Sequence, residues 1–226
     1  MSTYQGGTLI VRKNILSAVL ISSLFLTGCV FGPSAEEEIS KVLDATVEQE
    51  QGFVESQEPI KALEQEEKEI FNTIMGLSME EFDQIKALAE EAMANLEQRE
   101  EYLVAESDSI EEAQNEFNAI KDYVEDIDDE ALRSHVEEMI QLMNQRYELH
   151  NELIVKYKEA IELDRELYTL LQDEELAIEG LEAQIEKVNA QYDETIKLNE
   201  EFNNITDQYN ELKSEFYTMA GISDEE

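Results

Sequence analysis

The chain has 226 residues, of which 55 are Asp or Glu and only 16 are Lys or Arg, so its formal net charge is −39. A surface this acidic repels nucleic acid and anionic lipid headgroups, which excludes nucleic-acid binding as a function. Hydrophobic residues make up 42% of the chain and recur with a clear period, which predicts a folded protein and not a solvated acidic tail.

The first 28 residues have the organisation of a bacterial export signal. Arg12 and Lys13 stand immediately before an uncharged run at residues 15–26. As a helix, this run of about twelve residues extends roughly 18 Å, which is too short for a hydrocarbon core of about 30 Å. We therefore predict a signal peptide at residues 1–28 that is removed on export. The alternative is an uncleaved N-terminal anchor.

The end of this signal resembles the lipobox of bacterial lipoproteins. It reads Leu26, Thr27, Gly28 and Cys29: an aliphatic residue, two small residues and a cysteine. The resemblance implies that Leu26, Thr27 and Gly28 are recognised by the signal peptidase, that cleavage precedes Cys29, and that the Cys29 thiol carries lipid with fatty chains such as palmitate. Because cleavage removes the two basic residues of the leader, the net charge becomes −41. Cys29 is the only cysteine, so the mature chain has no internal disulfide and no thiolate for catalysis.

Residues 29–34 form a short linker from the lipidated cysteine to the first predicted helix, residues 35–75. Gly52 and Pro59 interrupt this helix, and because a proline inside a helix removes a hydrogen bond and clashes with the preceding turn, we expect a kink or break between them. Gly76 can end the helix, and Ser78 with Glu81 has the capping-box pattern that opens the next one.

The second helix is predicted at residues 79–125. Residues 109–112 repeat the capping-box pattern, but apolar residues keep helical spacing across them, so we predict continuous helix there. Asp126, Asp128 and Asp129 are N-cap candidates for the helix that follows. A second turn is therefore expected at residues 125–129.

Two apolar stripes define the remaining helices, predicted at residues 129–172 and 177–219. The first stripe runs through Leu132, Val136, Met139, Met143, Tyr147, His150, Ile154, Tyr157 and Ile161. The second runs through Ile178, Leu181, Ile185, Val188, Tyr192 and Ile196, then Phe202, Ile205, Tyr209, Leu212 and Phe216. We favour a turn near residues 172–177, although heptad spacing continues through it and one very long helix is the alternative.

The predicted fold is all-α: an elongated, antiparallel, up-and-down bundle of about four long helices with coiled-coil-like packing, over residues 35–220. Short connections make neighbouring helices antiparallel, and helices of this length reach roughly 65 Å. Residues 221–226 form an acidic C-terminal tail. The glutamate-rich runs are then mostly solvated helix faces.

No catalytic, cofactor or metal site is expected in the mature chain. His135 and His150 belong to no zinc or carboxylate-bridged iron motif, and His150 lies on the first stripe, which favours a core position. Residues 126–129 superficially resemble a calcium loop, but Ala131 stands where the loop requires glycine. Glutamates at 36–38 and 64–69 are interpreted as exposed faces, with weak cation binding as the alternative. We therefore predict a protein that is not an enzyme.

The lipobox, the AEEEI sequence at residues 35–39, the REEYL sequence at 99–103 and the LLQD sequence at 170–173 together resemble the YkyA-like lipoproteins of bacilli and staphylococci. This Gram-positive family is described as cell-wall-binding. The resemblance covers nearly the whole mature chain and implies an all-helical fold at the extracytoplasmic face of the cell membrane. It carries over no site residue beyond the lipobox.

The leading functional hypothesis is a membrane-anchored, non-enzymatic surface lipoprotein that binds cell-wall polymer or an envelope protein, through a side face or the membrane-distal tip. The alternative is a structural spacer or coiled-coil assembly factor, in which Phe53, Phe71 and Phe82 supply a second apolar stripe for another helix. An enzyme of envelope metabolism ranks third because the motifs for one are missing.

Overall fold

The structure, a computed structural model, describes residues 32–222, which form one helical unit beginning at Pro33. The predicted leader, the lipobox with Cys29, and residues 223–226 lie outside the described residues. The helices in chain order are α1 (Ala35–Gln49), α2 (Gln51–Met75), η1 (Met79–Glu81, a 3-10 turn), α3 (Phe82–Phe117), η2 (Asn118–Ile120, a 3-10 turn), α4 (Lys121–Val124), α5 (Glu130–Leu170) and α6 (Ile178–Ala220). Residues 32–222 contain no strand, so the all-α prediction is confirmed.

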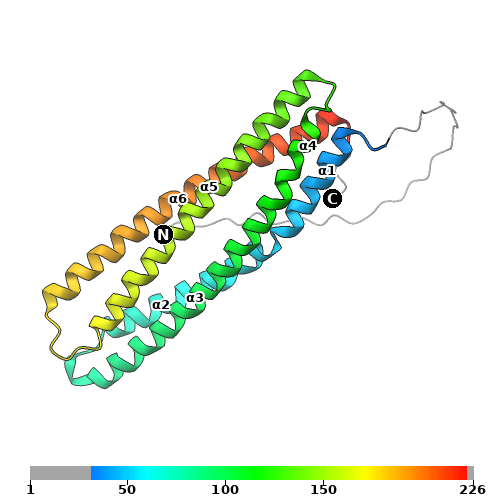
Figure 1. The fold of residues 1–226 in the computed structure, drawn as a ribbon. Coiled ribbons are helices and arrows are strands. Elements are labelled where there is room, and N and C mark those ends of the chain that lie inside the picture. The colour runs from blue at the N-terminus through cyan, green and yellow to red at the C-terminus, as the bar shows by residue number, and fades with distance from the viewer. Residues whose placement is uncertain (1–31, 223–226) are drawn as a thin grey trace, which may run out of the picture. The chain divides into compact units, whose positions relative to one another are not determined.

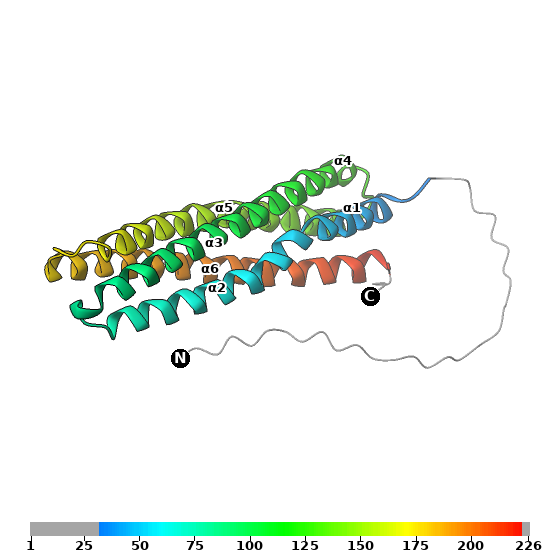
Figure 2. The same cartoon turned by 90° about the horizontal axis from the view of Figure 1, so that it is seen from below.

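The helices form a long up-and-down bundle made of two antiparallel hairpins (Figures 1 and 2). α2 packs along α3 in one hairpin, and α5 packs along α6 in the other. The hairpins are joined mainly by α3 against α5, while α1 packs on α3, η2 and α4. α1 begins at the same end of the bundle at which α6 finishes, and the α2–α3 and α5–α6 turns lie together at the opposite end (Figure 1).

Two apolar clusters fill the bundle, one toward each end. The first joins α1, the end of α3, α4, the first half of α5 and the end of α6, with Ile39, Phe117 and Phe216 among its fully buried members. The second joins α2, the first half of α3, the second half of α5 and the start of α6, with Leu96 and Tyr168 fully buried. Some of the buried polar side chains, among them Glu106, Ser109 and His150, lie between the two clusters.

Local capping sets the starts of two helices where the sequence predicts them, whereas the predicted helix at 79–125 divides into α3, η2 and α4. At Ser78 the backbone N–H donates to the Glu81 carboxylate at 3.1 Å, so the capping box is present and opens with the 3-10 turn η1. The Asp129 carboxylate accepts from the N–H groups of Ala131 and Leu132 at 2.8 and 3.1 Å and caps α5. α5 and α6 are separated by residues 171–177, so the prediction of a turn there is confirmed and one continuous helix is excluded.

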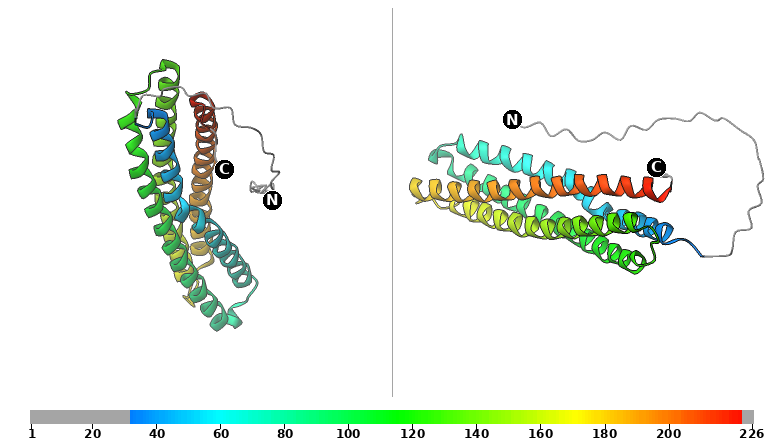
Figure 3. Two further views of the ribbon diagram at one scale, coloured as in Figure 1. Left: turned by 90° about the vertical axis from the view of Figure 1, so that its right-hand side faces the viewer. Right: turned by 90° about the horizontal axis from the view of Figure 1, so that it is seen from above.

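The first long helix is broken, but not where it was expected. The break falls at Glu50, which separates α1 from α2 two residues before Gly52, and Pro59 lies inside α2. Figure 3 shows the change of direction where the chain passes from α1 (blue) to α2 (cyan). The prediction of a kink between Gly52 and Pro59 was therefore wrong in position. Because proline has no N–H, α2 lacks one backbone hydrogen bond at Pro59 and still runs through it as a helix.

A side chain from α3 causes the break. The Ser109 hydroxyl donates to the carbonyl of Gln49 and accepts from the N–H of Phe53 at 3.0 Å, two groups that would bond each other in a continuous helix. An inserted side chain of this kind kinks a helix. α3 itself runs unbroken through Ser109, as predicted.

The two predicted apolar stripes differ in how fully they are buried. Every member of the Leu132 stripe is buried. On α6, Val188, Phe202 and Phe216 are buried, but Ile178 is 70% exposed and Ile196 is 54% exposed, which corrects the prediction for those two residues. Within residues 32–222 no helix combines the length and the apolar character needed to cross a bilayer.

Two glycine substitutions should change stability in opposite directions. A Cβ at Gly52 would lie 3.0 Å from the Cβ of Ser109, whereas a Cβ at Gly180 would meet no atom within 4 Å. We expect Gly52→Ala to destabilise the bundle by about 1–3 kcal/mol through overpacking at the break. Gly180→Ala should stabilise it by up to about 1 kcal/mol through reduced backbone entropy. Urea unfolding followed by circular dichroism measures both, and a stabilised Gly52→Ala would contradict the close packing of Ser109.

Candidate functional site

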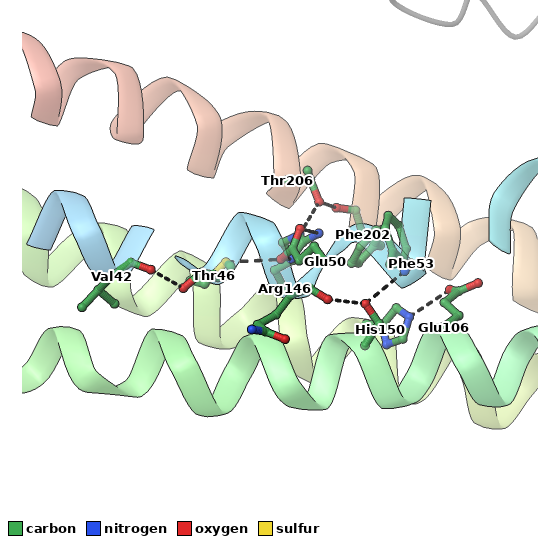
Figure 4. Close-up of polar contacts among 12 residues, drawn as sticks. Val42, Thr46, Glu50, Phe53, Glu106, Arg146, His150, Phe202 and Thr206 are labelled. Atoms are coloured by element: carbon green, nitrogen blue, oxygen red, sulfur yellow. Dashed lines mark hydrogen bonds and ion pairs between the residues drawn. The ribbon is translucent and has the colours of Figure 1, made fainter. Parts of the chain in front are cut away.

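The region between the two apolar clusters is built around a buried arginine on α5 (Figure 4). Arg146 is 3% exposed and donates through both terminal nitrogens to the Glu50 carboxylate, at 2.6 and 3.0 Å. Its Nε donates to the hydroxyl of Thr206 on α6 at 3.0 Å, and the guanidinium lies 5.0 Å from the ring centre of Phe202. A bidentate, charge-assisted pair of this kind fixes geometry as well as charge. It ties the α1–α2 junction to α5 and α6.

His150 lies one turn further along α5 and is fully buried, as the stripe predicted. Its Nε2 is 2.9 Å from the carboxylate of Glu106 on α3, and Gln57 on α2 donates to the same carboxylate at 3.0 Å. The imidazole ring also contacts the rings of Phe53 and Phe202 (Figure 4). This constellation links α2, α3, α5 and α6 inside the bundle, and Gln57 and Glu106 also line a small cavity of about 230 Å³.

A second polar cluster surrounds Arg99 on α3. Arg99 is fully buried and donates to the hydroxyl of Tyr192 at 3.1 Å and to the carboxylate of Asp164 at 3.5 Å. The Tyr192 hydroxyl donates to Asp164 at 2.6 Å, and the carboxylate of Glu67 lies 3.7 Å from the guanidinium. All four long helical segments, α2, α3, α5 and α6, therefore contribute to this cluster.

Burial changes the pKa of Asp164, the acidic residue at the centre of this cluster. The pKa of Asp164 is raised to about 7, because desolvation by burial and the nearby Glu67 carboxylate raise it by more than the Tyr192 hydrogen bond and the Arg99 charge lower it. Burial alone would lower the pKa of Arg99, but the oxygens of Tyr192 and Tyr157 and the Glu67 carboxylate more than offset this and hold that pKa above its ordinary value. The cluster therefore keeps its cation and holds a carboxyl group that titrates near neutrality.

Glu64, Glu66 and Glu69 are exposed, as interpreted, while Glu67 is partly buried, and three of these glutamates also bind groups of other helices. Glu64 accepts a hydrogen bond from Tyr157, and Glu67 accepts one from Tyr168. Glu66 accepts from the amide of Asn95 at 3.1 Å. These side chains satisfy polar groups at the α2–α3 and α2–α5 contacts. In the part of the chain described here, no three His, Cys, Asp or Glu side chains converge in a way that holds a metal ion.

The apolar side chains proposed as a second stripe lie mostly within the bundle. Phe53 contacts His150 and Phe202, and Phe71 packs against the second apolar cluster. Phe82 instead lines a surface cavity. The three phenylalanines therefore do not form one stripe for another helix.

That cavity lies at the turn end of the bundle, defined here as residues 74–85 and 171–182. Its volume is about 350 Å³, within the range of about 300–1,000 Å³ typical of ligand pockets. Apolar side chains from both turns line most of it, including Ile74, Leu77, Ile85, Leu171, Leu176 and Leu181. A lining of this kind can bury an apolar group of a ligand or partner.

Sequence reasoning did not single out Arg99, Arg146 or the turn-end cavity. Arg99 does stand in a run of buried α3 positions with helical spacing, between Leu96 and Leu103, so a charged residue inside an apolar register was the available signal. The predicted site residues, Cys29 and the three residues before it, lie outside the described part of the chain.

Comparisons with known proteins place this fold among relatives. The YkyA family model, described as "Putative cell-wall binding lipoprotein", matches residues 34–219. The "Uncharacterized lipoprotein YkyA" of Bacillus subtilis (strain 168) is 33% identical over 166 residues, which cover 74% of this chain and 74% of the relative. A crystal structure of a conserved protein of unknown function from Staphylococcus aureus superposes with a TM-score of 0.52 at 15% identity, covering 83% of this chain and 97% of that one.

Replacement of Asp164 should change how stability depends on pH. The folded protein holds the Asp164 proton between about pH 4 and 7, where the unfolded chain releases it, so unfolding free energy falls as pH rises through this window. We expect Asp164→Asn to remove about 2–4 kcal/mol of that fall. Urea unfolding at several pH values between 4.5 and 7.5 measures it. Asp207→Asn, an exposed site on α6, is the control, and parallel pH profiles for wild type and Asp164→Asn would contradict the assignment.

Proposed function

The chain belongs to the YkyA family of lipoproteins, and from this premise we propose that it is a lipid-anchored, non-enzymatic helical bundle that binds a component of the cell envelope. The observation that carries the proposal is the match of the family model across residues 34–219, nearly the whole bundle. The leader, the lipobox and lipid attachment at Cys29, which place the bundle on the outer face of the membrane, belong to the same proposal.

The geometry supports a binding role over a catalytic one. Two clusters of titratable groups join helices to one another: Arg146 pairs with Glu50, and Arg99 pairs with Asp164. The cavity at the turn end has an apolar lining. A bundle with both features is a rigid support for a binding surface.

Orientation follows from the anchor. Only five residues separate Cys29 from Ala35, and a fully extended stretch of that length reaches less than about 20 Å. The end of the bundle at which α1 begins would therefore stand near the membrane. α5 and α6, with 41 and 43 residues, extend roughly 60–65 Å and would hold the turn end away from it.

Lipidation is tested at Cys29. Because a thioether-linked diacylglycerol supplies the hydrophobic anchor, we expect wild-type protein to partition into the detergent phase of Triton X-114 and Cys29→Ala to shift to the aqueous phase or keep its leader. Ser22→Ala, within the leader but outside the lipobox, should behave as wild type. An intact mass showing an unmodified Cys29 in the membrane-bound protein would refute the anchor.

Binding to wall polymer should depend on divalent cations. With a net charge of −41 after cleavage, the bundle meets an anionic polymer as a like charge, and bridging cations are needed to hold the two together. We expect retention on purified wall sacculi in millimolar Mg²⁺ to fall at least about tenfold with EDTA, since bound divalent ions are the largest local charges at such a contact. Retention that is indifferent to EDTA would point to direct recognition of the wall, and capture of a protein from intact envelopes would point to a protein partner.

A further inference from the structure

Three large apolar side chains are exposed at the turn end. Met75 is 50% exposed, Met79 is 57% exposed and Ile178 is 70% exposed, and all three line the cavity there. They come from the end of α2, from η1 and from the first turn of α6, so both turns present apolar side chains to the same opening. Contiguous apolar surface around a concavity is typical of an interaction site.

The charge around this opening has a single sign. No Lys or Arg occurs between Lys68 and Lys86, or between Arg165 and Lys187, so the turn end contains no basic residue. The exposed acidic side chains of the turn end are Glu80, Glu81, Asp83, Asp173, Glu174, Glu175, Glu179 and Glu182. Asp173 and Glu174 also line the cavity.

We propose that the turn end is a docking site for a basic, apolar segment of another protein. A leucine, isoleucine or aromatic side chain of that segment enters the cavity, and flanking lysines or arginines pair with the acidic rim. The proposal rests on the proposed function in that a lipid at Cys29 leaves the turn end facing outward. It adds a location and a partner chemistry to that function.

Charge argues against the other occupants. A second copy seated end to end would bring two acidic rims together, and anionic wall polymer or an anionic membrane would meet the same repulsion. The chain's own C-terminal residues are also acidic, and α6 ends at the opposite end of the bundle (Figure 1). A cationic segment is the occupant that gains from both the rim and the apolar lining.

A peptide titration tests the proposal. The lipidated protein, held in zwitterionic phosphatidylcholine nanodiscs, is titrated into a fluorescent peptide with two central leucines flanked by lysines, and binding is followed by anisotropy against empty nanodiscs. We expect Ile178→Asn and Met79→Asn each to weaken binding about fivefold to tenfold, because each removes apolar area buried by the peptide. Glu174→Gln should weaken it at low salt and have little effect at high salt.

Matched controls separate docking from general attraction between opposite charges. Val54→Asn and Val155→Asn change side chains that are 64% and 54% exposed outside the turn end, and they should leave affinity unchanged. Peptides with glutamate in place of lysine, or serine in place of leucine, should bind at least about tenfold more weakly. Equal loss at all four positions, or none at Ile178 and Met79, would overturn the proposal.

Two further measurements would show whether the turn end binds a second copy of the chain or lipid in place of a basic segment. A dimer in sedimentation that Ile178→Asn dissolves would assign the surface to a second copy, and binding to phosphatidylglycerol vesicles lost in the same variant would assign it to lipid; either result overturns the proposal. In cells, a photocrosslinker at Ile178 should capture basic, apolar peptides that one at Val54 does not. Envelope partners that remain bound to Ile178→Asn would refute this site while leaving the proposed function intact.

Discussion

Two buried arginines connect the hairpins of this bundle, and the arrangement of the helices depends on them. Arg146 binds Glu50 at the α1–α2 junction and Thr206 on α6, and Arg99 binds Asp164 on α5 and Tyr192 on α6. A cation removed from water is tolerated only when carboxylates and hydroxyls surround it, so each arginine requires its partners at one axial position. In a chain with 55 acidic residues, these contacts select which carboxylates turn inward and leave the others in solvent.

The break between α1 and α2 lies beside Arg146. Ser109 takes the hydrogen bonds that Gln49 and Phe53 would otherwise make with each other, and the break places Glu50 beside Arg146. Phe53 then packs against His150 and Phe202. The interruption of the helix and the buried ion pair thus depend on one another, and both lie between the two apolar clusters. Apolar contacts alone fix the axial alignment of neighbouring helices weakly, so these polar contacts help to set it.

Much of the fold was predictable because its signals are local. Ser78 with Glu81 and the aspartates before Ala131 act within one turn of the chain, and the Leu132 stripe is read from one helix alone. The errors arise where a distant residue decides the outcome. Ser109, which breaks the first predicted helix, lies 56 residues from Phe53. Arg99 sits in the α3 register with a spacing that marked it for burial, but its partners on three other helices could not be read from that spacing.

The first turn of α1 and the last turn of α6 share one end of the bundle, where the Tyr217 hydroxyl donates to Asp44 at 3.3 Å. Any sequence fused after residue 226 is therefore delivered to the side on which the chain enters the fold. With the proposed lipid anchor at Cys29, a fluorescent reporter attached there would sense the neighbourhood of the bilayer and leave the two hairpin loops at the far end unobstructed. A reporter inserted into the loop at residues 171–177 would do the reverse, sampling the outer environment while blocking whatever approaches from it.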